Sequence, residues 1–342
     1  MWSADCPWAE AERLQVNVAK RILQCPIRTS GDAAMGELGW QSLEARWQQL
    51  RLCFWSKILR SPSTSPIRRV YDETVRFHSL HASEEDFVPS AAAAEGWEVY
   101  RARSVNGMAS LWCAQIQRDL FTVGVESVWN SPAAGALTVS HPAWKEKVRI
   151  AVGIREQCRW WRRVQQSASL SLFASLKQVG RLQREAYLEI THGGWNDRIR
   201  IGRMALTVRR TGSSSLRVHT GRWEHLDREQ CLCAMCGTAV QTEEHLLLDC
   251  STFHSARGIL YSTLETWLQQ AETAARIPQP APWRVRDDSV SARMQLLLSG
   301  HHPRLAAAGL TRRALRLILL TVGQWLQRHE EHRQHIRGIC EK

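Results

Sequence analysis

Three cysteines and one histidine are the residues of this chain whose types and spacing are best suited to chemistry. Cys233 and Cys236 are separated by two residues, eight residues follow before His245, and four more precede Cys250. A structural zinc site takes four tetrahedral nitrogen and sulfur ligands, and a Cys-x-x-Cys turn places two sulfurs about 2.3 Å from one ion. The spacing therefore predicts a closed Zn²⁺ site at these four residues, without an open position for catalysis.

The residues between the four ligands support the same interpretation. Gly237 directly follows the second cysteine and lets the backbone turn its amides toward the sulfurs. Residues 242–244, Thr-Glu-Glu, favour the start of a helix that carries His245 in its first turn. Five residues span roughly 140° around an ideal helix, so we expect Cys250 to lie where that helix ends or bends.

Other donors lie within reach of the same site. Cys231 could supply an alternative ligand or remain a spare thiol, and three histidines are close in sequence, namely His219, His225 and His254. The alternative to a metal site is a set of unrelated buried thiols with a core histidine. The order and spacing of the four ligands favour zinc, which would tie residues 233–250 together and contribute on the order of 10 kcal/mol to a local fold.

The net charge of +12 is concentrated in one part of the chain. Between Lys145 and Trp223 there are 17 Lys and Arg against 5 Asp and Glu, whereas the rest of the chain has 28 of each. Because Arg pairs bidentately with phosphate and stacks on bases, this segment predicts contact with RNA or DNA rather than with a membrane. The residues expected to make that contact are Arg159, Arg162, Arg163, Arg209, Arg210, Arg217, Arg222 and Trp223.

Two other interpretations of the basic segment stay open, namely a solvated face that aids solubility and Arg side chains paired with carboxylates elsewhere. Arg residues at positions 209–222 on one exposed face would favour nucleic-acid binding, whereas pairing with Glu and Asp would favour a scaffold. Most of the 16 Trp are expected in the core. Only Trp160, Trp161 and Trp223 have enough Arg around them to stack on unpaired bases.

The spacing of apolar residues predicts helices in much of the chain. Leu14, Val18 and Ile22 recur every four residues before Pro26, and Ser42 is expected to cap a second helix. Strand-like alternation is scarce, so we expect a mainly α fold with a small CCHC zinc-binding knuckle. The pattern predicts a helical region at 1–66, a poorly defined helical region at 67–140, a basic helical segment with the knuckle at 141–265, a Pro-containing linker at 266–310 and a C-terminal helix at 311–342.

Composition excludes several classes of protein. The 342 residues, 44% hydrophobic and 23% charged, are normal for a folded chain with a sizeable core. No window approaches 18 uninterrupted apolar residues, so no membrane span is expected. The start of the chain lacks the basic and apolar regions of a secretory signal, so the ten cysteines are expected to be thiols or metal ligands rather than disulfides.

The cysteine-rich segment and its surroundings resemble one known family, the non-LTR retrotransposon reverse transcriptases. The likeness is to the zinc-knuckle-like region after the polymerase, and it rests on Gly221-Arg222-Trp223, Cys233-x-x-Cys236, the run from Glu244 to Cys250, Phe253 and Arg257. The run from Leu206 to Leu216 resembles the basic stretch before that knuckle, and the Trp-rich N-terminal helices are similar to the tail after the polymerase thumb. The resemblance covers roughly residues 9–75 and 140–262.

The resemblance implies the post-polymerase region without the polymerase. A polymerase needs paired carboxylates for two metal ions, and the only Asp-Asp pair, at residues 287–288, follows no apolar strand. No endonuclease block is present either. We therefore expect a non-catalytic, zinc-stabilised module that binds RNA or DNA, with a reverse transcriptase polymerase region as a possible partner in trans.

Two further functions compete with this expectation. The alternative is a zinc-stabilised helical scaffold or protein-interaction module without nucleic-acid binding. A metal-dependent nuclease rests on thirteen histidines and is disfavoured, because no convincing set of carboxylates accompanies an open metal.

Overall fold

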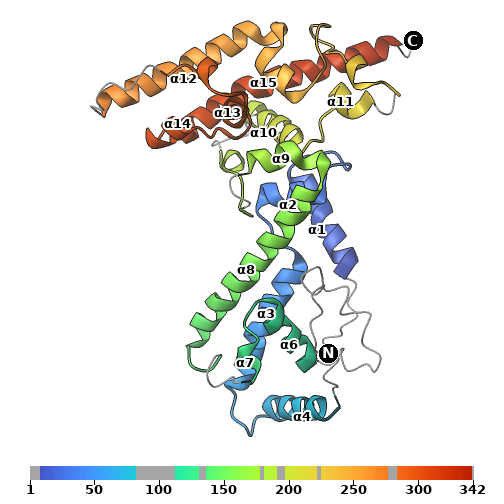
Figure 1. The fold of residues 1–342 in the computed structure, drawn as a ribbon, viewed down its shortest axis with the longest axis vertical. Helices are drawn as coiled ribbons and strands as arrows, with labels where there is room; N and C mark the ends of the chain where they lie inside the picture. Colours follow the sequence, from blue (N-terminus) through green and yellow to red (C-terminus); the bar gives the residue numbers. More distant parts are fainter. Residues whose placement is uncertain are drawn as a thin grey trace. The chain divides into compact units, whose positions relative to one another are not determined.

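The structure is a computed structural model (Figure 1) that describes residues 8–81, 112–130, 136–177, 181–190, 197–221, 225–275 and 283–340. The chain divides into two compact units, each built from two separate stretches. Unit 1 comprises Met1–Gln15 and Gln41–Arg159, and unit 2 comprises Val16–Trp40 and Trp160–Lys342. Helices α1 (Trp8–Ile22) and α8 (His141–Gln166) each contribute residues to both units.

Unit 1 is built around buried tryptophans. Its other helices are α3 (Leu43–Leu59), α4 (Pro66–His81), α6 (Trp112–Thr122) and α7 (Ser127–Asn130). Trp55 and Trp144 are fully buried with ring centroids 6.0 Å apart. The Nε1 of Trp55 donates to Tyr71 Oη over 2.8 Å, and that of Trp144 donates to the carbonyl of Leu52 over 3.1 Å. Both indole N–H groups are therefore satisfied, which allows these large side chains to fill the core.

Helices α1 and α3 lie where the sequence predicts them, but α1 does not bury the face that was expected to pack. Ser42 Oγ accepts a hydrogen bond from the amide of Ala45 over 3.2 Å, which confirms the predicted N-cap of α3. On α1 the predicted stripe is exposed, with Leu14 65%, Val18 40% and Ile22 54% accessible. The buried residues of that helix and its end are Ala19 and Leu23. A spacing of four thus identified the helix, although it did not identify the buried face.

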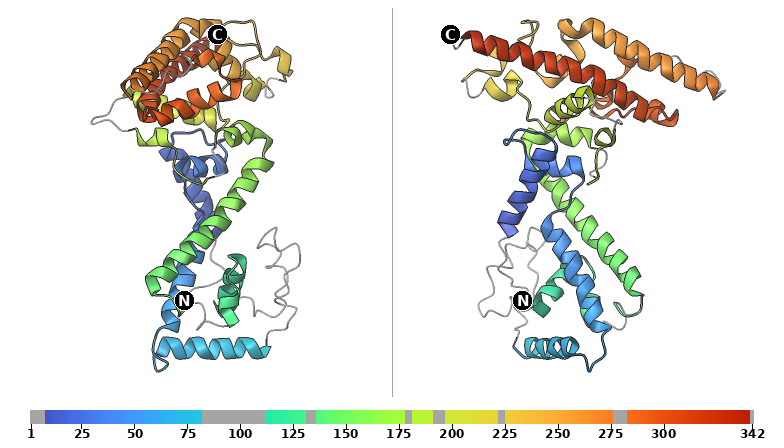
Figure 2. Two further views of the ribbon diagram at one scale, coloured as in Figure 1. Left: turned by 60° about the vertical axis from the view of Figure 1, so that its left-hand side comes forward. Right: turned by 180° about the vertical axis from the view of Figure 1, so that it is seen from behind.

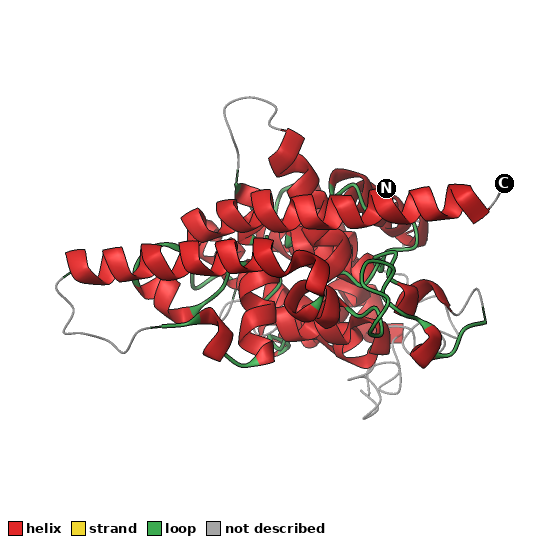
Figure 3. Ribbon diagram, turned by 90° about the horizontal axis from the view of Figure 1, so that it is seen from above, coloured by secondary structure: helices red, strands yellow, loops and turns green. Residues whose placement is uncertain are grey.

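Unit 2 consists of short helices around two long ones, α12 and α15, which lie side by side (Figures 2 and 3). Its helices are α2 (Gly31–Leu38), α9 (Ser171–Leu176), α10 (Asp197–Arg210), α11 (Arg217–Thr220), α12 (His254–Ala274), α13 (Val290–Ser299), α14 (Pro303–Ala307) and α15 (Thr311–Cys340). Single turns are η5 (Ala168–Leu170), η7 (Ala186–Glu189), η9 (Arg228–Gln230), η10 (His245–Asp249), η11 (Ser251–Phe253) and η12 (Val285–Asp287). One large apolar core joins most of these elements, and a smaller cluster with Trp160, Leu170 and Phe173 packs separately.

The mainly α fold is confirmed. Within the described ranges the only strand-like pairings are the isolated bridges Leu38–Arg184 and Leu232–Val240, and Figure 3 accordingly draws helices and loops alone. The predicted linker at 266–310 needs correction, because the end of α12 and all of α13 and α14 lie in that range. Leu296, Leu297 and Leu298 of α13 are fully buried, and this apolar run makes the segment part of the core.

The structure bears on the predicted C-terminal helix, on the region at 67–140 and on membrane-spanning helices. The C-terminal helix begins at Thr311, as predicted. The region at 67–140 contains α4, α6 and α7, while its residues 82–111 and 131–135 lie outside the described ranges, as do residues 276–282 of the predicted linker. No described helix is both long enough and apolar enough to cross a membrane.

Helices α10 and α15 approach each other at two glycines. A Cβ on Gly202 would lie 2.2 Å from the carbonyl oxygen of Leu319, and a Cβ on Gly323 would lie 2.5 Å from the Cα of Gly202. Real Cβ atoms are not found so close to backbone atoms. Since the neighbours are backbone rather than flexible side chains, only glycine allows this contact between the two helices.

A buried charge network fixes the end of α10 to α2 and η7. Arg210 is fully buried, its Nε donates to Glu37 Oε1 over 2.9 Å, and its Nη2 lies 2.7 Å from Glu185 Oε2. Tyr187 Oη donates to the second oxygen of Glu37 over 2.6 Å. Burial lowers the pKa of Arg210, but the negative charges of Glu37 and Glu185 raise it by more than burial lowers it. The pKa therefore lies above its usual value, and the guanidinium stays protonated.

We predict that Gly202→Ala destabilises the protein and that Gly258→Ala does not. The first change forces a methyl group against the backbone of α15, and overpacking of this kind costs about 1–3 kcal/mol. Gly258 lies within α12, where the nearest atom to an added Cβ is Arg286 Nη2 at 3.8 Å, so alanine should stabilise that helix by up to about 1 kcal/mol. Urea unfolding measures both effects. Equal stability of Gly202→Ala and the wild type would contradict the close packing of α10 and α15.

Candidate metal centre

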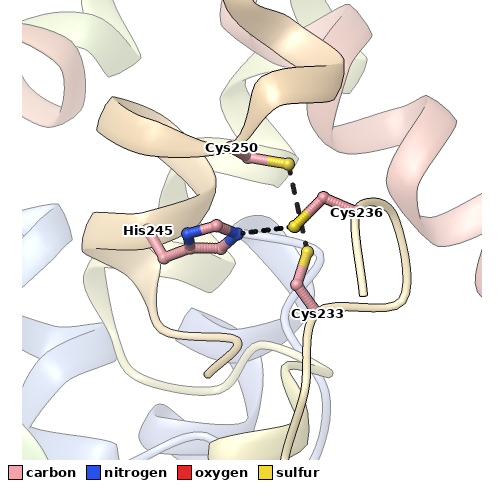
Figure 4. A group of neighbouring side chains, drawn as sticks. All are labelled: Cys233, Cys236, His245 and Cys250. Atoms are coloured by element: carbon pink, nitrogen blue, oxygen red, sulfur yellow. Dashed lines mark hydrogen bonds between the residues drawn. The ribbon is translucent and has the colours of Figure 1, made fainter. Parts of the chain in front are cut away.

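The four predicted ligands converge in unit 2 (Figure 4). The donor atoms of Cys233, Cys236, His245 and Cys250 all lie within 4.8 Å of one another. The sulfurs of Cys233 and Cys250 are 4.0 Å apart, and Cys236 Sγ is 3.3 Å from His245 Nε2. Four ligands about 2.3 Å from a central ion would be separated by about 3.8 Å at tetrahedral angles. The cluster therefore has the donor set and the dimensions to hold a metal ion.

A tight turn presents the first two sulfurs. The amide of Gly237 donates to the carbonyl of Cys233 over 2.7 Å, and the amide of Cys233 donates to the carbonyl of Ala239 over 2.7 Å. Gly237 has a φ of 70°, in the left-handed region that glycine adopts without strain. The bridge between Leu232 and Val240 closes the base of this turn. The structure thus confirms the conformational role predicted for Gly237.

A widened helical turn presents the other two ligands. The amide of His245 donates to Thr242 Oγ1 over 3.0 Å, which begins the helical segment where the sequence predicts it. Residues His245–Asp249 then form a π-helical turn, and the amide of Cys250 donates to the carbonyl of His245 over 2.7 Å. This bond spans five residues instead of the four of an α-helix. Cys250 lies at the end of the turn, as expected, and its sulfur points toward the same centre as the imidazole (Figure 4).

The two thiols of the Cys-x-x-Cys turn have different acidities. Burial raises the pKa of Cys233 to about 11. Burial also raises the pKa of Cys236, but hydrogen bonds from the Thr238 hydroxyl and amide and from His245 outweigh it and bring the pKa to about 6. The Thr238 hydroxyl donates to Cys236 Sγ over 3.2 Å. Cys236 is thus prepared as a thiolate, the form that binds metal ions.

Surrounding side chains hold the ligand segments in place. Arg257, which is buried, donates from Nη2 to the carbonyl of Cys250 over 2.8 Å. Thr252 Oγ1 donates to the carbonyl of Met235 over 3.2 Å and joins the two halves of the site. Such contacts orient metal ligands without touching the ion. The sequence does not indicate that Arg257 and Thr252 support the site, because their contacts with these carbonyls follow only from the fold.

Cys231 is not part of the cluster. Its thiol donates to the carbonyl of Asp227 over 3.4 Å, and its sulfur would lie 2.5 Å from a Cβ on Gly221. Among the described residues the group of potential metal donors contains neither Cys231 nor His219, His225 and His254. The alternative ligands considered from the sequence are therefore not assembled around this centre.

Two of the arginines predicted to contact nucleic acid are buried, and the prediction was wrong for them. Arg209 is 3% exposed and its Nη1 lies 3.4 Å from Glu243 Oε2, while Arg210 is 0% exposed and pairs with Glu37 and Glu185. Glu243 also accepts a hydrogen bond from Ser214 Oγ over 2.7 Å. Both guanidinium groups neutralise buried carboxylates, so neither can reach a phosphate. Arg209 instead ties α10 to the residues just before His245.

Two further arginines predicted to contact nucleic acid pair with carboxylates of the same chain. Arg159 pairs with Glu44 over 2.6 Å and with Glu156 over 3.3 Å, and Arg163 pairs with Asp32 over 2.9 Å. Trp160 is 1% exposed and donates to the carbonyl of Asp32, so it is a core residue rather than a stacking platform.

The remaining predicted contacts differ in exposure. Arg162 is exposed, whereas Trp161 and Arg217 are partly buried. Arg222 and Trp223 lie outside the described residues.

Comparison with known proteins adds no further assignment. The chain matches no protein-family model, no curated protein and no solved structure. The metal centre therefore rests on its own geometry.

We predict that Cys236→Ser abolishes metal binding and that Cys231→Ser leaves it intact. The first change removes one of four donors, while the second removes a thiol that bonds to Asp227 and not to the centre. Plasma mass spectrometry of the purified variants should find about one metal ion per chain in the wild type and in Cys231→Ser. Retention of a full equivalent of metal by Cys236→Ser would contradict the four-ligand site.

Proposed function

We propose that the chain is a non-catalytic module that binds nucleic acid and is stabilised by one zinc ion. Three thiolates and one imidazole are the ligand set that structural zinc takes in proteins. Cys233, Cys236, His245 and Cys250 would fill all four tetrahedral positions, so the ion would have no free position for water or substrate. When bound, zinc supplies cross-linking of residues 233–250 rather than Lewis-acid chemistry.

The observation that carries nucleic-acid binding is the charge of the unit that holds the metal centre. Unit 2 contains 29 Lys and Arg against 18 Asp and Glu, a surplus of 11, whereas unit 1 contains 16 against 15. Almost the whole net charge of +12 therefore belongs to unit 2. A surplus of this size attracts a polyanion, and the attraction falls with salt because counterions are released on binding.

The binding surface must differ from the one expected from sequence, because Arg209 and Arg210 are buried. Arginines that remain exposed on unit 2 include Arg162, Arg163, Arg181, Arg184, Arg198, Arg228, Arg312 and Arg316. The resemblance to the post-polymerase region of non-LTR reverse transcriptases agrees with this proposal. In such a protein the module would act beside a polymerase region, in the same chain or in trans.

A helical scaffold or protein-interaction module is the second candidate, and one observation favours it. Arg159, Arg163, Arg209 and Arg210 all pair with carboxylates of the same chain. Pairing of this kind is what a scaffold requires, and it involves four of the arginines that the sequence predicted to contact nucleic acid.

Binding across a salt series separates the two candidates. For nucleic-acid binding we expect single-stranded RNA or duplex DNA to bind with a dissociation constant below about 10 µM at low salt, and the logarithm of the binding constant to fall linearly with the logarithm of salt concentration. Fluorescence anisotropy with labelled 20-mers measures both. Absence of binding at low salt, or binding without a salt slope, would favour the scaffold.

Substitution with cobalt tests the identity of the bound ion. We expect the purified protein to contain zinc, and Co²⁺ exchanged into the site to give the intense visible absorption of tetrahedral thiolate coordination. His245→Ala should reduce that absorption, since it removes the nitrogen donor. A spectrum of octahedral cobalt, or an iron content equal to one per chain, would contradict a zinc site.

A further inference from the structure

The exposed side of α15 carries arginines that no described carboxylate neutralises. Between residues 311 and 328, α15 has four Arg and no Asp or Glu. All four are exposed, namely Arg312, Arg313, Arg316 and Arg328. Arg312 and Arg316 make no hydrogen bond and no ion pair with the other residues that the structure describes. They differ in this from the arginines of the basic segment that pair with carboxylates.

Helix geometry places three of these arginines side by side. Successive residues lie about 100° apart around an α-helix, so Arg312, Arg313 and Arg316 fall within about 100° of one another. Ala314 and Ile318, on the opposite side of the helix, are fully buried in the core of unit 2. The core therefore holds α15 with these three cations turned outward, and we refer to them as the α15 arginine face.

The carboxylates of the neighbouring helix are already used. Helix α12 lies beside α15 (Figure 3) and has two acidic residues, Glu265 and Glu272. Both oxygens of Glu272 accept hydrogen bonds from Arg304 Nη2, over 2.8 and 3.0 Å. Glu265 accepts a hydrogen bond from the amide of Val285 over 2.9 Å and lies 3.3 Å from Arg284 Nη1. Neither carboxylate pairs with the α15 arginine face.

Helix stability does not account for arginines at this position. The first turn of α15 contains no acidic residue, although it contains Arg312 and Arg313. A cation near the N-terminus of a helix opposes the helix dipole, whereas Asp or Glu would be favourable there. Like charges four residues apart, such as Arg312 and Arg316, also repel each other. An arrangement that costs stability in this way is expected where a negatively charged partner binds.

A tryptophan of α12 lies under one of the three arginines. The guanidinium carbon of Arg313 lies over the Trp267 ring, 3.9 Å from its centroid. Trp267 is partly buried and Arg313 is exposed, so the guanidinium contacts the indole and remains open to solvent. Planar guanidinium groups stack on nucleobases as well as on aromatic rings. The pair of Arg313 and Trp267 therefore offers a stacking surface to an unpaired base.

We propose that the α15 arginine face binds a single-stranded nucleic acid. Arg312 and Arg316 would contact phosphates of the backbone, and one base would stack on the guanidinium of Arg313. A single strand fits this surface because its bases are free to stack on the protein, whereas the bases of a duplex are already stacked on one another. The function proposed above is the basis of this assignment, which adds the surface and the class of strand.

Two matched double variants of the full chain test the phosphate contacts. Arg312→Gln with Arg316→Gln removes two cations from the α15 arginine face, and Arg181→Gln with Arg228→Gln removes two from exposed positions outside α12 and α15. Fluorescence anisotropy measures the binding of a labelled oligouridine strand over a salt series. The α15 variant should bind more weakly than the control variant. Its salt slope should be smaller by about 1.4, since each lost phosphate contact of a single strand removes about 0.7.

The variant Arg313→Lys tests the stacking contact, because lysine keeps the charge but not the planar guanidinium. Binding of oligouridine should weaken about fivefold or more, with an unchanged salt slope. An abasic strand with the same number of phosphates is the control, and its binding should not change, since it has no base to stack. An equal loss for both strands, or no loss for either, would overturn stacking on Arg313 and with it the preference for a single strand.

The outcomes separate this surface from the proposed function, once circular dichroism has checked that each variant folds. If the wild type binds oligouridine but the α15 and control variants have equal salt slopes, the α15 arginine face is overturned and the proposed function stands. If the α15 variant loses binding to duplex DNA but not to oligouridine, the surface takes a duplex and the single strand is overturned. If the wild type binds no nucleic acid at low salt, the proposed function is overturned together with this surface.

Discussion

The last turn of α10 is the constraint on which unit 2 depends, because it carries two adjacent buried guanidinium groups that face different carboxylates. Arg209 faces Glu243, two residues before the candidate metal ligand His245, and Arg210 faces Glu37 and Glu185. Removing one partner of a buried ion pair typically costs about 3–5 kcal/mol, since the other charge is left without compensation. One helix end therefore fixes the metal-binding segment, α2 and the segment before η7 with charge as well as with apolar contacts.

The cluster of four potential metal ligands could be predicted from the sequence because its determinants are local. Four ligands within 18 residues, a glycine after the second cysteine and a helix start before His245 are all read along the chain. The expected end of the helix at Cys250 follows from helix geometry alone. The π turn itself was not predicted, since an α-helix and a π turn differ by one residue in hydrogen-bond register.

The roles of the arginines could not be predicted because their partners are distant in sequence. Arg210 and Glu37 are 173 residues apart, and Arg209 and Glu243 are 34 residues apart. Composition counts a cation in the same way whether it faces solvent or a buried carboxylate. The stripe on α1 shows the same limit, since periodicity predicted the helix, whereas the tertiary fold decided that Leu14, Val18 and Ile22 are exposed. The glycine contact between α10 and α15 also depends on residues far apart in the chain.

The interleaving of the two units has a practical consequence for how the chain can be divided. A fragment that begins at Trp160 would keep Arg210 and the whole metal centre but would lose Glu37, which belongs to the stretch Val16–Trp40. Trp160 would also lose the carbonyl of Asp32 that accepts its indole proton. Expression of the metal-binding half therefore requires the N-terminal stretch, supplied in the same chain by a short connection in place of residues 41–159 or added as a separate peptide.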